Sequence, residues 1–244
     1  MLNNVLLYNS GGGIGDSLQI LPLINTLKSK FSNTKFFYLS AHENHFNSSL
    51  KDFNSQIDTL DLNMKYFGFR WWHALVVKRK IKNKSIYLFD LIIDLQSKIR
   101  NSLILKLIPH KSFISSCLNF HLSNPNLKIL KEKKNYNTVL KAINTIYEKN
   151  YKIEEFNINK IDKKFFNESE KLLPKNNYVG FSITQGNIYR KKQWSLDNII
   201  KICNKFIEYK KTPVFFIEKK NKELKNKIEK LVPSALFPEH ETNI

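Results

Sequence analysis

Residues 5–16 read VLLYNSGGGIGD, a pattern that indicates how the chain begins to fold. An apolar run at Val5–Tyr8 meets a glycine-rich turn, and the residues from Ser17 to Lys30 then carry apolar side chains at helical spacing. A second apolar run follows at Lys35–Leu39. Strand, glycine turn, helix and strand form the β-loop-α-β unit of a parallel sheet. The sequence therefore predicts an α/β fold whose first loop, Ser10–Asp16, lies at the ligand-binding edge of the sheet.

The alternation of strands and helices continues along the chain in two halves. A polar stretch rich in Lys and Asn runs from residue 151 to 177 and contains Pro174, so we place a domain junction there and expect domains at 1–174 and 175–244. Both are expected to be doubly wound and Rossmann-like. The expected strands after the first unit are 87–95, 112–116, 178–183, 213–217 and 235–237, and the expected helices are 97–108, 135–150, 195–209 and 221–231.

The composition is that of an ordinary globular protein with an unusual charge. The chain has 244 residues, 42% of them hydrophobic, and a formal net charge of +19. Such a charge favours a polyanionic partner, but Lys, Asn and Ile are abundant throughout, which is also typical of drift toward A/T-rich codons. The sequence leaves both explanations open.

Several classes of protein are excluded by simple patterns. The two cysteines, Cys117 and Cys203, lie far apart and outside any Cys/His cluster, so neither a disulfide framework nor a zinc site is predicted. The N-terminus lacks the basic and apolar regions of a signal peptide, and no run approaches the roughly 20 apolar residues of a spanning helix. We expect a cytoplasmic protein, with peripheral contact at the inner face of the cytoplasmic membrane as an open alternative.

The glycine turn does not fit a dinucleotide-binding fingerprint. A G-x-G-x-x-G pattern that starts at Gly11 puts its last glycine at Asp16, and one that ends at Gly15 puts its first at Ser10. No Walker lysine follows either. A carboxylate at Asp16 would repel a phosphate, whereas the positive end of a helix dipole stabilises it. Asp16 therefore suits a general base or a hydroxyl-orienting group, and the alternative is that it only caps the helix.

Two further loops carry charged residues at the ends of predicted strands. Asp94 lies inside a buried apolar run and needs a partner there. Lys98 and Arg100 follow it at a helix start, where a pair of cations could hold a carboxylate or phosphate, or could simply be solvated. In the second half, three cations at 190–192 precede Trp194, a pattern that suits diphosphate binding with a packed aromatic behind it.

Three stretches together resemble glycosyltransferase family 9, the lipopolysaccharide heptosyltransferases and their relatives. They are Gly15-Asp16 with Leu21-Pro22-Leu23, then Asp94-Leu95-Gln96 followed by Arg100, and Val179-Gly180-Phe181 through Lys192-Gln193-Trp194. Ser97 stands where the family usually has glycine. The resemblance implies a GT-B fold of two Rossmann-like domains, with the acceptor on the first and the nucleotide-sugar mainly on the second.

The resemblance also implies roles for particular residues. The reaction would be inverting sugar transfer without metal or cofactor, from a nucleotide-sugar such as ADP-heptose to an anionic glycolipid of the lipopolysaccharide type. Asp16 corresponds to the catalytic base. The implied acceptor contacts are Gly13, Gly15, Gln96, Lys98 and Arg100, and the implied donor contacts are Thr184, Gln185, Lys192 and Glu223. The family's second domain continues into a loop with Asp, Gly and His, so a sequence that stops at Ile244 is expected to hold an incomplete second domain.

Two rival functions remain to be weighed. A nucleotide-dependent oxidoreductase would need the missing glycine spacing, and Glu43 falls late for ribose binding. A basic protein that binds RNA or anionic lipid could use Trp71-Trp72-His73 followed by Lys78-Arg79-Lys80 as a surface patch. We expect instead that these tryptophans pack between helices and that the lysines are solvated, and no nucleic-acid partner is expected.

Overall fold

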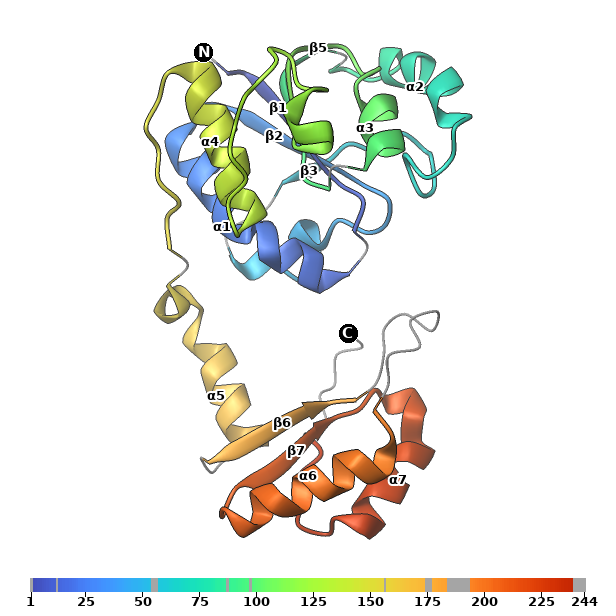
Figure 1. Ribbon diagram of the computed structural model, residues 1–244, viewed down its shortest axis with the longest axis vertical. Coiled ribbons are helices and arrows are strands. Elements are labelled where there is room, and N and C mark those ends of the chain that lie inside the picture. The colour runs from blue at the N-terminus through green and yellow to red at the C-terminus, as the bar shows by residue number, and fades with distance from the viewer. Residues whose placement is uncertain are drawn as a thin grey trace. The chain divides into compact units, whose positions relative to one another are not determined.

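In the computed structural model the chain forms two compact units, Met1–Ile158 and Asn159–Ile244 (Figure 1). The structure describes residues 2–11, 13–53, 57–86, 88–96, 98–155, 157–173, 177–183 and 194–238. The division between the units and the junction expected after residue 174 both fall within the polar stretch 151–177. A short 3-10 turn, η4 (Ile158–Lys160), lies at the division.

The first unit is built on a parallel sheet with strand order β3-β2-β1-β4-β5. The strands are β1 (Asn4–Asn9), β2 (Lys35–Ser40), β3 (Asp58–Thr59), β4 (Phe89–Asp94) and β5 (His110–Ser115). The helices are α1 (Ile14–Lys30), α2 (His73–Lys82), α3 (Ile99–Leu105) and α4 (Asn135–Tyr147), with 3-10 turns η1 (His45–Asn47), η2 (Lys51–Phe53) and η3 (Cys117–Phe120). The chain reverses its direction of winding between β1 and β4, as in Rossmann-like sheets.

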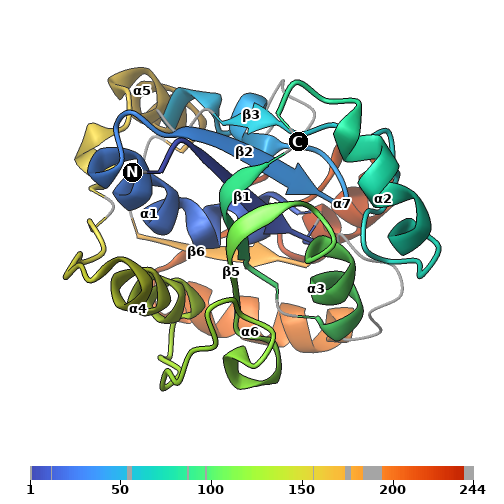
Figure 2. The ribbon, with the colours of Figure 1, turned by 90° about the horizontal axis from the view of Figure 1, so that it is seen from above.

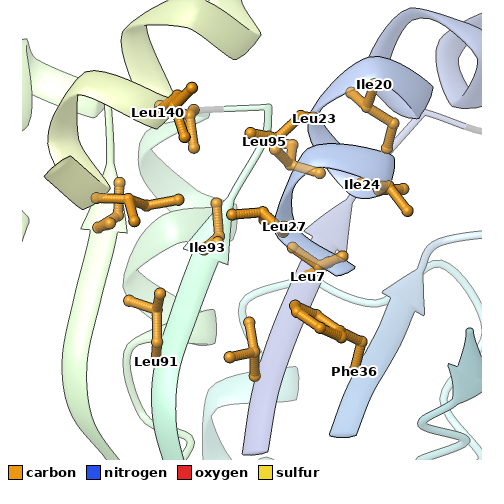
Figure 3. Close-up of a cluster of buried hydrophobic side chains, with 14 of the residues drawn as sticks. Leu7, Ile20, Leu23, Ile24, Leu27, Phe36, Leu91, Ile93, Leu95 and Leu140 are labelled. Atoms are coloured by element: carbon orange, nitrogen blue, oxygen red, sulfur yellow. The ribbon is translucent and has the colours of Figure 1, made fainter. Parts of the chain in front are cut away.

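Helices cover both faces of this sheet (Figure 2). Side chains alternate along a strand, so Val5 and Leu7 of β1 pack on the face that carries α1 and α4, while Leu6 and Tyr8 pack on the opposite face with α2 and α3. Figure 3 shows the first of these cores, where Leu7 of β1 lies among side chains of α1, α4 and β4. Burial on both faces explains why the strands read as continuous apolar runs.

The second unit holds a smaller parallel sheet. Strands β6 (Tyr178–Ser182) and β7 (Thr212–Phe216) pair in parallel, and Leu236 extends the sheet beside Val214. The helices are α5 (Lys163–Leu172), α6 (Leu196–Glu208) and α7 (Lys222–Leu231), with the 3-10 turn η5 (Lys219–Asn221) before α7. Its core is small and consists of Ile199, Cys203, Phe215, Ile228 and Val232, with partly buried neighbours around it.

Most predicted elements are present, with shifts at their ends. Ser195 caps α6 as predicted, because its side chain accepts a hydrogen bond from the Asn198 N–H. The helix expected over 97–108 is too long: α3 begins only at Ile99, because Lys98 has extended backbone angles, and it ends at Leu105. Two helices, α2 and α5, were not predicted. Helix α5 lies in the polar stretch 151–177 that we assigned to a domain junction, and it buries none of its residues.

Candidate functional site

The loops after β1 and β4 are neighbours at the carboxyl edge of the first sheet. These strands pair in parallel with Tyr8 opposite Asp94, so the segments that follow them leave the sheet side by side. One is the glycine turn that leads into α1, and the other begins with Leu95 and Gln96 and leads to α3. Ligands of open α/β sheets bind at this edge, at the point where the strand order reverses.

The glycine turn brings the Asp16 carboxylate back over its own loop. Gly13 is the N-cap of α1, and Asp16 in the first turn donates its backbone N–H to the Gly13 carbonyl at 3.1 Å. A Cβ built on Gly11 would lie 2.4 Å from Asp16 Oδ2, and one built on Gly13 would lie 3.8 Å from the same oxygen. Gly11 must therefore be a glycine for the carboxylate to occupy this position.

A cluster of buried polar atoms lies beneath this turn. The Asn9 Oδ1 accepts hydrogen bonds from the Gly11 N–H at 2.9 Å and from Gln96 Nε2 at 2.7 Å, which ties the two loops together. The Asn9 Nδ2, the Ser10 Oγ and the Tyr38 hydroxyl are buried without a hydrogen-bond partner of normal geometry. Burial raises the pKa of Tyr38 to about 12, so its hydroxyl stays protonated at neutral pH. Buried polar groups without partners mark places where a bound molecule or water completes the bonding.

Asp94 has a structural position and is not exposed to a ligand. Its buried carboxylate accepts hydrogen bonds from the Ser102 hydroxyl, from the Ser115 hydroxyl at 2.8 Å and from the Gln96 N–H at 3.1 Å. These donors come from α3, β5 and the turn after β4. The partner that the sequence required for Asp94 is therefore present, and Asp94 fixes the turn that carries Gln96.

The structure brings Lys98 and Arg100 together on one aromatic ring. The Lys98 ammonium lies 5.4 Å and the Arg100 guanidinium 5.8 Å from the centre of the Phe69 ring. The Arg100 Nε also donates a hydrogen bond to the Gly68 carbonyl at 3.0 Å. This pair thus forms a cationic position at the start of α3, as the sequence suggested, and Arg100 is held by Gly68, a residue that the sequence did not single out, in the loop before α2.

That loop, residues 66–73, is fixed to the sheet by buried hydrogen bonds. The Tyr8 hydroxyl donates to the Phe67 carbonyl at 2.9 Å and accepts from Asn101 Nδ2 at 2.9 Å, and the Gly68 N–H donates to His73 Nδ1 at 3.0 Å. The partners lie up to 93 residues apart in sequence. The one local signal for this loop is a glycine between two aromatic residues, Phe67 and Phe69.

We expect Gly68→Ala to lower the free energy of unfolding by about 2 kcal/mol. Gly68 has φ +83°, and a Cβ there would lie 2.6 Å from the buried Tyr8 hydroxyl. Gly15→Ala is the matched control, because a Cβ on Gly15 meets nothing within 4 Å and alanine favours the helix. Urea unfolding followed by circular dichroism measures both, and equal stabilities for the two variants would contradict the packing described.

His73 makes the same loop sensitive to pH. Its Nδ1 accepts a hydrogen bond, so the ring is neutral, and burial together with the nearby Arg70 and Arg100 lowers the pKa of His73 from its usual 6.5. A lowered pKa stabilises the fold above pH about 6.5, and this contribution is lost as the pH falls through the lowered value. We expect the melting temperature of the wild type to fall as the pH is lowered, and to fall less steeply in His73→Asn. In the control His121→Asn, which changes an exposed histidine, the dependence on pH should equal that of the wild type. Parallel slopes in all three proteins would refute this role.

Three aromatic residues lie differently from the prediction. Trp71 and Trp72 do not pack between helices, since 61% and 50% of their surfaces are exposed. Trp194, expected as a packed aromatic, is 67% exposed. The reason for Trp72 is that α2 buries the stripe His73, Val77 and Ile81, which turns the opposite side outward.

The expected donor residues are only partly within the described structure. Thr184, Gln185 and Lys192 lie outside the described residues. Glu223 is in the first turn of α7 and is exposed. Within the described ranges there is no group of three or more His, Cys, Asp or Glu side chains placed to hold a metal ion. Over the same part of the chain, no helix has the length and hydropathy needed to cross a membrane.

Two α/β units in this order, the first a doubly wound parallel sheet, define the GT-B fold, and comparison with solved structures confirms it. The chain is similar to a glycosyl transferase family 9 structure from Veillonella parvula, with 15% identity, a TM-score of 0.55, and coverage of 99% of this chain and 67% of that one. It is also similar to the E. coli heptosyltransferase WaaC with ADP, with 12% identity, a TM-score of 0.59, and coverage of 98% and 75%.

A third similar structure is a UDP-GlcNAc 2-epimerase from Neisseria meningitidis bound to UDP-GlcNAc, with 12% identity, a TM-score of 0.51, and coverage of 99% of this chain and 73% of that one. Scans for a matching protein family and for a similar curated protein find none. At these identities the likenesses establish the fold that the sequence resemblance implied.

Proposed function

We propose that this chain is a glycosyltransferase that moves a sugar from a nucleotide-diphosphate donor to a glycan acceptor. The observation that carries the proposal is the Asp16 carboxylate, which is held over Gly11 at the start of α1 and at the carboxyl edge of a GT-B domain. The buried side chains of Asn9, Ser10 and Tyr38 form a polar cluster beside the same turn. A carboxylate above such groups suits a base that receives a hydroxyl proton.

Asp16 acts on the acceptor in this mechanism. Its carboxylate takes the proton of an acceptor hydroxyl while that oxygen attacks the anomeric carbon of the donor sugar. The new C–O bond forms as the bond from the anomeric carbon to the diphosphate breaks, and the configuration inverts. Gly13 and Gly15 add no side chains beside the carboxylate, which leaves the acceptor hydroxyl room to approach it.

The cations at the start of α3 provide the acceptor contacts. Lys98 and Arg100, gathered on Phe69, would hold an anionic group of the acceptor, because a guanidinium and an ammonium both pair well with carboxylate or phosphate. Gln96 would act mainly through its bond to Asn9, which joins this turn to the glycine turn. This arrangement favours an anionic acceptor over a neutral sugar, and the sequence resemblance favours a glycolipid of the lipopolysaccharide type.

The donor side of the proposal rests on the sequence resemblance. Thr184, Gln185 and Glu223 would line the nucleotide-sugar site, and Lys192 would stabilise the negative charge that builds on the leaving diphosphate without a metal ion. The resemblance favours heptose as the sugar and ADP-heptose as the donor. The reaction would take place in the cytoplasm, at the inner face of the membrane.

The proposal is tested by a sugar-transfer assay on the full-length gene product, with ADP- and UDP-sugars as donors and an anionic glycolipid core as acceptor. We expect a glycosylated product by mass spectrometry and its loss in Lys192→Ala and Asp16→Asn. Wild-type rates in both variants would refute the site assignment. Nucleotide or RNA binding without any product from these donors would favour the rival function, a Rossmann-like binding protein.

A further inference from the structure

Helix α2 lies at the periphery of the first unit (Figure 1, Figure 2), and one of its sides carries exposed apolar and basic side chains. Trp71 and Trp72 directly precede the helix, and Leu75 lies in its first turn with 84% of its surface exposed. The exposed cations Lys78, Arg79 and Lys82 occupy the later turns. We call these six residues the α2 face.

The helix geometry lines up this face. Trp72, Leu75, Arg79 and Lys82 are spaced by three, four and three residues, which puts them on one side of an α-helix. The opposite side, which includes Val77 and Ile81, is buried in the core. Apolar side chains therefore project from the first turn and cations from the last, all away from the sheet.

The sequence around α2 carries positive charges that no acidic residue balances. Residues 62–86 contain seven Lys and Arg side chains and no Asp or Glu. Among the described residues, none of these seven forms a salt bridge with a carboxylate. The positive potential around an exposed apolar patch attracts an anionic partner.

We propose that the α2 face docks on an anionic lipid bilayer. This deepens the proposed function, which places the reaction at a membrane, and vesicle binding tests it apart from sugar transfer. Tryptophan is enriched at the membrane interface, and Leu75 can enter the acyl boundary while the three cations meet lipid phosphates. Apolar insertion together with basic charge is the pair of signals that stable peripheral binding needs. An almost fully exposed aliphatic side chain favours lipid over RNA, where stacking and phosphate contacts suffice. Clustered lysines also disfavour a protein interface, whose core is depleted of them.

Tryptophan fluorescence can report on the α2 face separately, because the chain has only three tryptophans, Trp71, Trp72 and Trp194. In Trp194→Phe all tryptophan emission comes from the α2 face. We expect a blue shift on adding vesicles of phosphatidylglycerol and phosphatidylcholine in equal parts, and none with phosphatidylcholine alone. The double variant Trp71→Phe/Trp72→Phe keeps only Trp194, which is similarly exposed, and its emission should not move. No shift in Trp194→Phe with the anionic vesicles would overturn the proposal.

Vesicle sedimentation tests the two kinds of side chain separately. We expect Lys78→Gln/Arg79→Gln/Lys82→Gln to weaken binding about a hundredfold. The charge-matched control removes three exposed cations of the second unit, Lys201→Gln/Lys205→Gln/Lys230→Gln, and should weaken binding by less than about threefold.

Leu75→Ser should weaken binding about tenfold, whereas Leu130→Ser, at a leucine that is 87% exposed, should leave binding unchanged. Circular dichroism checks that every variant is folded. Equal losses in the two triple variants, or in the two leucine variants, would overturn the proposal. So would a shift of the Trp194→Phe emission with poly(U) RNA and not with anionic vesicles, because it would assign the face to nucleic acid.

Discussion

Asp16→Asn is expected to lower the turnover number for sugar transfer by about 10²- to 10⁴-fold, which is the contribution of a positioned general base. The amide keeps the shape of the side chain over Gly11 but cannot take the acceptor proton. The stability should change by less than about 0.5 kcal/mol, since Asp16 is only partly buried. Steady-state kinetics with a saturating nucleotide-sugar donor measures the effect.

A second helix offers a matched control for this variant. Asp197 occupies the first turn of α6 as Asp16 occupies the first turn of α1, so Asp197→Asn makes the same chemical change at the same kind of position. Its turnover should equal that of the wild type. If Asp16→Asn kept the wild-type rate, Asp16 would only stabilise the start of α1 through the helix dipole, since Gly13 and not Asp16 is the N-cap.

Asp94→Ala is expected to lower the free energy of unfolding by about 3 kcal/mol or more. The change leaves the buried hydroxyls of Ser102 and Ser115 and the Gln96 N–H without their acceptor. It also releases the turn whose Gln96 holds Asn9, so the glycine turn should loosen. Chemical denaturation gives the stability, and hydrogen exchange at the Gly11 amide reports the loosening.

An exposed aspartate sets the baseline for this variant. Asp61→Ala removes an exposed carboxylate that accepts from the nearby Asn63 N–H, and should cost less than about 1 kcal/mol. A similar loss of stability in Asp61→Ala and Asp94→Ala would show that the buried network is not what Asp94 contributes.

The sequence predicted the elements that rest on local pattern. The run that forms β4 is apolar because it is buried on both faces, and Ser195 could be recognised as a cap because capping needs only residues three positions apart. The glycine turn was equally local, since it requires glycines between a strand and a helix. Helix α5 was not predicted because its polar, Lys- and Asn-rich surroundings were assigned to a domain junction as a whole.

The candidate site residues also divide into those that local pattern predicts and those that depend on tertiary contacts. Asp16 could be singled out from its place at a predicted helix start. The roles of Asp94 and Gln96 could not, because they depend on hydrogen bonds to residues as far as 87 positions away in sequence. Trp72 was expected to pack between helices, but the burial of His73, Val77 and Ile81 on the other side of α2 leaves it exposed.

Local pattern was enough to predict an α/β chain with a glycine turn and a carboxylate at the start of its first helix, because backbone geometry and periodicity are properties of neighbouring residues. Which polar groups are hydrogen-bonded, which cations meet on Phe69 and which tryptophans are exposed follow only from tertiary contacts. Hydrogen bonding and burial depend on the residues that folding brings together from distant parts of the chain.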